Sequence, residues 1–163
     1  MKTLLIVFHS RTGGTRQMAC AAAAAAQTEP DVRVRLLAAG DAQPADVLDA
    51  DGYIFAAPEN LAALSGVMKD FFDRVYYPVL GRINGRPYGM LVCAGSDGTN
   101  AIRQMERIIT GWRLRAVADP VIVLTRAQTE PSILAPKQIA GEGLARCATI
   151  GATLAAGMAA GVF

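Results

Sequence analysis

Uninterrupted apolar runs alternate with amphipathic stretches along the chain. Leu4–Phe8, Gly52–Ala57 and Tyr88–Ala94 are continuous runs of apolar and β-forming residues, the pattern of strands that are buried on both faces of a sheet. Over 65–77 and 99–111, apolar residues recur every three or four positions, which predicts helices with one face packed on that sheet. Alternating buried strands and helices predict an α/β domain with a parallel sheet.

Two further strands complete the predicted sheet. Val32–Leu36 alternates apolar and charged residues with a period of two, as expected of an edge strand with one wet face. The last strand, over 114–124, is interrupted by Pro120, and a proline within a strand is tolerated mainly at an edge. With these two at the edges, the sheet is doubly wound, with five parallel strands in the order 2-1-3-4-5 between two helical layers.

The remaining helices are predicted from composition and from proline positions. An alanine-rich segment predicts a helix over 14–27, and Pro44 begins a short one. Pro78 is expected to end the helix over 65–77, and Pro136 to begin the final helix. No repeat or linker divides the chain, so a single domain over residues 1–163 is predicted.

The loop after the first strand combines hydroxyls, glycines and an arginine. Ser10-Arg11-Thr12-Gly13-Gly14-Thr15 lies between a buried strand and the alanine-rich helix. Free backbone N–H groups and the positive end of the helix dipole point out of such a loop, and the hydroxyls add further donors. This arrangement predicts a site for a phosphate monoester. An ordinary N-capping turn, with Thr12 or Thr15 as the cap, is the alternative interpretation.

The absence of two known phosphate-binding motifs narrows the class of phosphate ligand that this loop could bind. The chain has no G-x-x-x-x-G-K-[ST] loop of the nucleoside-triphosphate type and no G-x-G-x-x-G after the first strand. Two further loops, 58–66 and 94–99, follow the third and fourth strands. Because ligands of doubly wound sheets bind beyond the carboxyl ends of the strands, the three loops are expected to meet at one site.

At these three loops the chain resembles a known family. Phe8–Thr15, then Pro58-Glu59-Asn60 followed by 65–74, and Ala94–Gly98 are similar to the flavin loops of FMN-dependent NAD(P)H oxidoreductases of flavodoxin-like fold, the FMN reductase and quinone oxidoreductase type. The resemblance covers nearly the whole chain. It implies a flavodoxin-like fold, FMN as cofactor, and NADPH or NADH as co-substrate.

The resemblance also implies which residues hold the cofactor. Ser10, Arg11, Thr12, Gly13, Gly14 and Thr15 would hold the ribityl phosphate, whereas Gly95, Ser96, Asp97 and Gly98 would cover the pyrimidine end of the ring. Pro58, Glu59, Asn60 and Leu61 would run along the isoalloxazine edge and offer backbone N–H groups near N5 and O4. The flavin carries the chemistry, so no side chain is assigned as catalytic. No metal site is expected, because the chain has a single histidine and no cysteine cluster.

The second loop departs from the family pattern. Related proteins often place aromatic residues there to stack on the flavin, whereas this chain has Leu61 and Leu64. Either these aliphatic side chains are sufficient to pack against the flavin ring, or an aromatic side chain from another part of the structure stacks on it. Tyr76, Tyr77 and Trp112, from this chain or from a neighbouring subunit, are the candidates.

Several residues near the loops have two open interpretations. His9, the only histidine, either donates to the cofactor or substrate, or anchors its loop through a hydrogen bond. Asp97 either bonds the flavin or makes an ordinary turn, and Glu59 either touches the flavin or is a solvated carboxylate. Cys93 and Trp112 are expected to be packing residues of the core.

Composition and charge exclude other classes of function. The chain is 52% hydrophobic with a net charge of +2 and has no basic block, so nucleic-acid binding is not expected. Its three cysteines are far apart and fit neither a disulfide scaffold nor a zinc site. Met1-Lys2 leads directly into a strand, and the apolar C-terminal segment is shorter than a bilayer span of ~20 residues. We therefore expect a cytoplasmic protein that does not insert into membranes.

The sequence thus predicts an FMN-binding oxidoreductase that passes electrons from NAD(P)H through the flavin to a quinone or similar small acceptor. A hydride would pass from the nicotinamide C4 to the flavin N5. The alternative is a flavodoxin-type electron carrier, although carriers dock through a negative face, which a net charge of +2 disfavours. A third interpretation is a flavodoxin-like domain that binds FMN weakly or not at all. The family resemblance also implies a homodimer or homotetramer.

Overall fold

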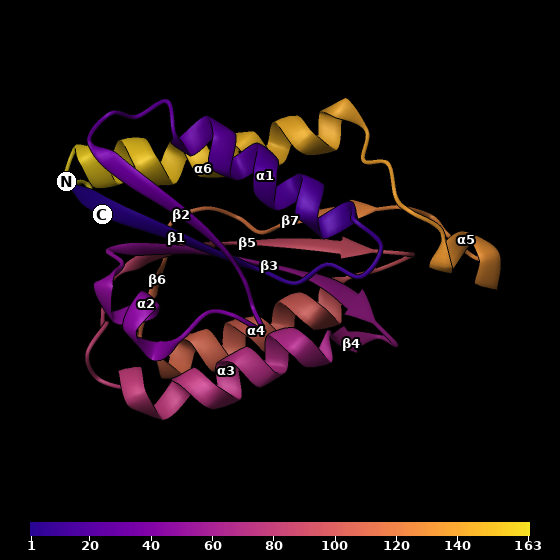
Figure 1. Cartoon of the computed structure of the whole chain (residues 1–163), viewed down its shortest axis with the longest axis horizontal. Helices are drawn as coiled ribbons and strands as arrows, with labels where there is room; N and C mark the ends of the chain where they lie inside the picture. The colour runs from indigo at the N-terminus through magenta and orange to yellow at the C-terminus, as the bar shows by residue number, and fades with distance from the viewer.

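A twisted sheet forms the middle layer of the computed structural model, which describes residues 1–163. Its parallel strands, in order across the sheet, are β2 (Val32–Ala38), β1 (Lys2–Phe8), β3 (Gly52–Asn60) and β5 (Pro87–Ala94), with the short β6 (Arg115–Ala116) and β7 (Val121–Leu124) both paired to β5 at the far edge. This order confirms the predicted flavodoxin-like sheet (Figure 1). The predicted fifth strand is present as two pieces, β6 and β7, divided by the stretch that contains Pro120.

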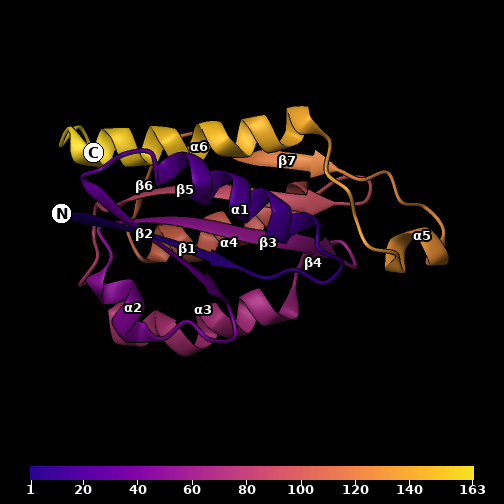
Figure 2. The ribbon, with the colours of Figure 1, turned by 45° about the horizontal axis from the view of Figure 1, so that its top comes forward.

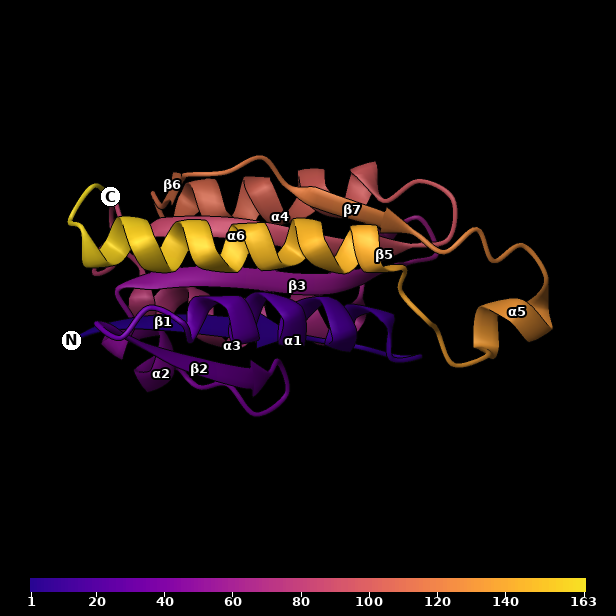
Figure 3. The same ribbon diagram turned by 90° about the horizontal axis from the view of Figure 1, so that it is seen from above.

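Helices cover both faces of the sheet. α1 (Gly14–Ala26) and α6 (Gly141–Ala159) lie on one face, and α2 (Pro44–Asp49), α3 (Gly66–Val79) and α4 (Thr99–Gly111) lie on the other (Figures 1 and 3). The short helix α5 (Glu130–Leu134) projects beyond the carboxyl ends of the strands, outside both layers (Figure 2). None of these helices has the length and apolar character needed to cross a membrane.

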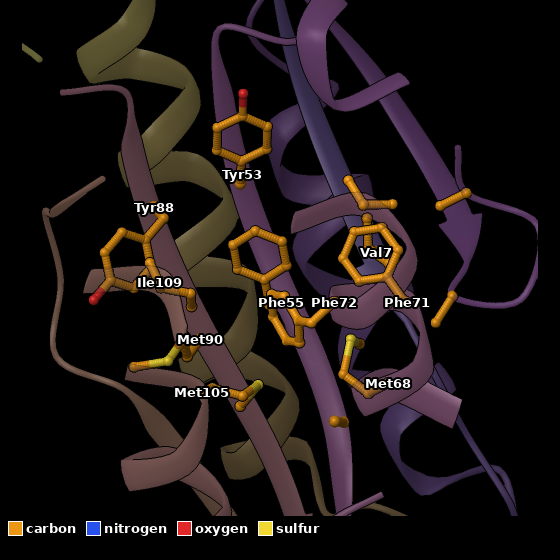
Figure 4. Close-up of a cluster of buried hydrophobic side chains, with 14 of the residues drawn as sticks. Val7, Tyr53, Phe55, Met68, Phe71, Phe72, Tyr88, Met90, Met105 and Ile109 are labelled. Carbon is orange, nitrogen blue, oxygen red and sulfur yellow. The ribbon is translucent and has the colours of Figure 1, made fainter. Parts of the chain in front are cut away.

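An aromatic cluster fills the core between the sheet and α3 and α4. The Phe55 ring of β3 lies 5.4 Å from that of Phe72 and 6.1 Å from that of Trp112, centre to centre (Figure 4 shows the phenylalanines). Trp112 is fully buried, which confirms it as a packing residue, and its Nε1 donates to the Tyr76 carbonyl. This packing fixes β3, whose carboxyl end carries the second predicted loop.

Strand β3 is longer than predicted. It continues through Pro58 to Asn60 and then turns back into β4 (Ala63–Leu64), which pairs with it antiparallel. The Ala56 carbonyl accepts from His9 N–H, so the backbone groups of residues 56 and 58 both point toward β1. The β1–β3 pairing ends at Phe8 and Ala56, so an N–H at position 58 would lie beyond the end of β1. Pro58 therefore sacrifices no ladder hydrogen bond, and the strand continues.

Two expectations from proline positions are wrong. Pro78 lies inside α3, which ends at Val79, because a proline in the last helical turn removes only one intrahelical bond. Pro136 does not begin the final helix; it lies in the linker between α5 and α6, and α6 begins at Gly141. α6 packs on the sheet through an apolar face that includes the buried Cys147, Ile150 and Leu154.

Candidate functional site

The loop from β1 to α1, residues 10–15, carries unpartnered backbone N–H donors at the start of a helix and is called the anion loop. Gly13 adopts a left-handed backbone with φ of 91°, and its N–H donates to Ser10 Oγ at 3.1 Å. No acceptor within the protein is bonded by the backbone N–H groups of Ser10, Arg11, Thr12, Gly14, Thr15 and Arg16. These unpartnered donors lie at the positive end of the α1 dipole, where a phosphate is stabilised.

Thr15 gives independent evidence for a ligand at this loop. Its side chain is buried, with 1% of the residue exposed; Oγ1 has no oxygen or nitrogen partner in the protein, and only the Cys93 thiol, a weak hydrogen-bonding group, lies beside it. A buried hydroxyl without a partner is costly, and folded proteins rarely keep one without a reason. The N-capping alternative is not met, because no side chain caps α1, whose N-cap residue is Gly13.

The second loop is the tip of the β3–β4 hairpin. Leu61 and Ala62 both adopt left-handed backbones, with φ of 50° and 60°, although neither is the glycine or asparagine that such a turn favours. Two side chains of α4 hold the hairpin: Asn100 Nδ2 donates to the Ala62 carbonyl and Gln104 Oε1 accepts from Leu64 N–H, both at 2.7 Å. The strained turn is thus imposed by tertiary contacts, as is common at functional sites.

The third loop joins β5 to α4 and is open to a ligand. The backbone N–H groups of 95–98 have no acceptor within the protein. The Asp97 carboxylate accepts from the Thr99 hydroxyl at 2.8 Å and from Thr99 N–H at 3.3 Å, so its side chain makes the turn that precedes α4. The chain returns here after β7, since Arg126 N–H donates to the Gly95 carbonyl at 2.8 Å.

A cavity of about 120 Å³ lies where the three loops meet. Of the predicted residues, those that line it are Arg11, Thr12, Pro58, Glu59, Asn60 and Gly95. The other predicted residues belong to the same loops but lie around the cavity and do not line it: Ser10, Gly13, Gly14, Thr15, Leu61, Ser96, Asp97 and Gly98. Glu59 Oε2 is buried and has no donor, so a ligand N–H group would satisfy it.

The sequence interpretation missed the wall that closes the cavity from the side of α5. Thr125, Ala127, Ile133, Leu134 and Lys137 also line it, all from the segment between β7 and α6. The signal was an apolar pair, Ile133-Leu134, within a polar stretch that has no helical periodicity. Cys93 lines the cavity as well as being buried, and burial raises the pKa of its thiol, which stays protonated at neutral pH.

The candidates for stacking on a flat ring lie elsewhere in this chain. Leu64 is 7% exposed and belongs to the core, so it does not form an aliphatic wall. Trp112 is fully buried and Tyr76 stacks on it, with ring centres 5.8 Å apart. Tyr77 is exposed on α3, and none of these three aromatic residues lines the cavity.

His9 joins the first loop to α3. Its Nδ1 lies 2.9 Å from the buried Ser65 Oγ, which is the loop-anchoring hydrogen bond considered above. Burial, and then the charge of Arg11, lower the pKa of His9 below its ordinary value of 6.5. His9 is therefore neutral at pH 7 in the folded protein.

The lowered pKa of His9 predicts a loss of stability in mild acid. As the pH falls below about 6.5, His9 takes up a proton in the unfolded chain before it does so in the folded one, so the free energy of unfolding decreases. No other side chain has an ordinary pKa in this range, because His9 is the only histidine. We expect urea unfolding between pH 7.5 and 5.5 to show this loss, and His9→Asn to remove it. An equal pH dependence in the variant would contradict the assignment.

Comparison with known proteins agrees with this geometry. Residues 42–129, more than half of the chain, match the model of the NADPH-dependent FMN reductase family, and the chain belongs to that family. A curated protein of Aquifex aeolicus named flavodoxin is 36% identical over 97 residues, which are 60% of this chain and 50% of that protein. The chain thus spans about half the length of this curated relative.

Solved structures share the fold over nearly the whole chain. A flavodoxin from Streptococcus pneumoniae TIGR4 is 20% identical with a TM-score of 0.74, over 94% of this chain and 98% of that one. A WrbA-like flavodoxin from Agrobacterium tumefaciens is 20% identical with a TM-score of 0.70, over 98% of both chains. Rubredoxin oxygen:oxidoreductase from Desulfovibrio gigas is 16% identical with a TM-score of 0.76, over 98% of this chain and 37% of that one. At these identities the likeness concerns the fold alone.

Proposed function

We propose that the chain binds FMN and catalyses electron transfer from NADPH or NADH to a quinone or similar small acceptor. The observation that carries the proposal is the anion loop with its buried, unpartnered Thr15 hydroxyl, placed beside a cavity at the carboxyl ends of β1, β3 and β5. A flavin mononucleotide requires phosphate donors and a neighbouring cavity with apolar and polar groups, and the lining here includes both. Membership of the FMN reductase family supports the same cofactor.

Each loop has a role in the proposed site. The backbone N–H groups of residues 10–12, 14 and 15 would hold the phosphate, and Thr15 would add its hydroxyl. Residues 58–61 follow the edge of the ring, where the free Glu59 oxygen accepts from a ligand N–H group. The unbonded N–H groups of 95–98 would donate to the pyrimidine end. When bound, FMN supplies the capacity to accept a hydride and pass electrons on, and the protein orients it and excludes water.

Anaerobic reduction of the loaded protein tests this proposal. The purified protein is loaded with FMN, NADPH or NADH is added, and flavin absorbance at about 450 nm is followed. Bleaching within seconds is expected, and it would justify a screen of quinones. Gel filtration of the same sample measures the oligomeric state, for which the family resemblance implies a homodimer or homotetramer.

A flavodoxin-type electron carrier is the second candidate, favoured by the curated relative that is named flavodoxin. Retained FMN that neither nicotinamide bleaches would support the carrier and exclude the reductase. Absence of any retained FMN would exclude both and leave a flavodoxin-like domain without the cofactor.

A further inference from the structure

Helix α5 carries two apolar side chains that face the cavity without being buried by the protein. None of its five residues is buried, and the helix lies outside both helical layers (Figures 2 and 3). Ile133 is 50% exposed and Leu134 is 53% exposed, yet both line the cavity. Such side chains would gain apolar burial from a ligand that enters the cavity beside them.

The position of α5 is set by the same residues that frame the anion loop. Lys137 Nζ donates to the carbonyls of Ser132, Ile133 and Ala135 at 2.6–2.9 Å and so holds the carboxyl end of α5. The backbone N–H of Lys137 donates to the Thr12 carbonyl at 2.8 Å. Gln17 completes the connection, because its Nε2 donates both to the Lys137 carbonyl at 2.7 Å and to the Gly13 carbonyl at 3.0 Å.

The opposite side of the cavity offers no comparable surface. Leu61 is fully exposed at the hairpin tip, Leu64 is in the core, and no aromatic side chain lines the cavity. The cavity of about 120 Å³ is also smaller than the ~300 Å³ at which ligand pockets usually begin. Since α5 has no buried residue, a small displacement of this wall to admit a ring would cost little packing.

We infer that Ile133 and Leu134 of α5 form the apolar wall against which the flat ring of the cofactor packs, in place of the aromatic side chains that the hairpin lacks. This inference rests on the proposed function, since it concerns the ring of FMN. Lys137 and Gln17 are positioning residues, which connect the carboxyl end of α5 to the anion loop.

Flavin binding by a double variant, Ile133→Ser with Leu134→Ser, tests the wall. FMN and riboflavin, which lacks the phosphate, are titrated while flavin fluorescence is followed. We expect both dissociation constants to rise about tenfold, because the loss concerns the ring that both ligands share. Leu80→Ser is the matched control: Leu80 is 43% exposed, follows α3 at the opposite end of the molecule, and its replacement should change neither constant.

A second variant keeps the test independent of any loss of folding. Leu134→Trp adds an indole to α5, and the natural Trp112 is buried in the aromatic core. We expect FMN to quench the fluorescence of the added tryptophan and to bind at least as tightly as in the natural protein, because aromatic rings stack.

The outcomes separate the wall from the proposed function. If the natural protein binds neither flavin, the proposed function fails and the wall fails with it. If the natural protein binds FMN, but the double variant binds both flavins equally well and the added tryptophan is not quenched, the wall alone is overturned.

Discussion

Replacing Thr15 with valine is expected to stabilise the FMN-free protein and at the same time to weaken FMN binding. The Thr15 hydroxyl is buried with no oxygen or nitrogen partner and only the weakly hydrogen-bonding Cys93 thiol beside it, so its removal in a side chain of similar shape relieves a desolvation cost. The expected gain in the free energy of unfolding is about 1 kcal/mol. The same hydroxyl would donate to a bound phosphate, a charge-assisted bond worth about 1.5–3 kcal/mol, so the FMN dissociation constant should rise about tenfold to hundredfold.

Urea unfolding without FMN and a fluorescence titration with FMN measure the two effects. Thr149→Val is the matched control, because the Thr149 hydroxyl donates to the Ala145 carbonyl on the exposed side of α6. The control should leave the FMN dissociation constant unchanged. A fall in the stability of Thr15→Val would mean that the hydroxyl is paired in the protein, and an unchanged FMN affinity would mean that it does not face the ligand.

The sheet could be predicted because local pattern and tertiary position agree in its strands. Leu4–Phe8 and Tyr88–Ala94 are apolar throughout and are buried in the structure, apart from the half-buried Phe8. The edge strand β2 alternates in sequence and is largely half-buried. A short, continuous apolar run is compatible with few structures other than a strand that is buried on both faces of a sheet.

The hairpin and α5 could not be predicted, because distant contacts determine them. A turn through Leu61 and Ala62 contradicts the local preference for glycine or asparagine, and it exists because Asn100 and Gln104 of α4 bind the hairpin. Five residues of α5 carry no helical periodicity, and its position depends on Lys137. The loops of the site were therefore found from the sequence, whereas the wall facing them was not.

Replacing Gly151 with alanine is expected to destabilise the protein, although alanine normally favours a helix over glycine by about 1 kcal/mol. A Cβ at position 151 of α6 would overlap the Ala22 carbonyl oxygen of α1 and lie only 2.7 Å from the carbonyl carbon. Because these are backbone atoms, no side-chain rotation relieves the overlap, and the two helices must separate. We expect the free energy of unfolding to fall by about 3 kcal/mol, the upper end of the usual cost of overpacking.

Gly141→Ala is the matched control in the same helix, because no atom lies within 4 Å of a Cβ there. Its stability should be unchanged or slightly raised, so equal stabilities of the two variants would show that α1 and α6 tolerate separation. The close approach also matters for the site, since α1 begins at the anion loop and α6 follows the linker whose Lys137 N–H bonds Thr12. Separation of the helices should therefore weaken FMN binding by the folded Gly151→Ala protein. An unchanged FMN dissociation constant would mean that this packing serves the fold and not the site.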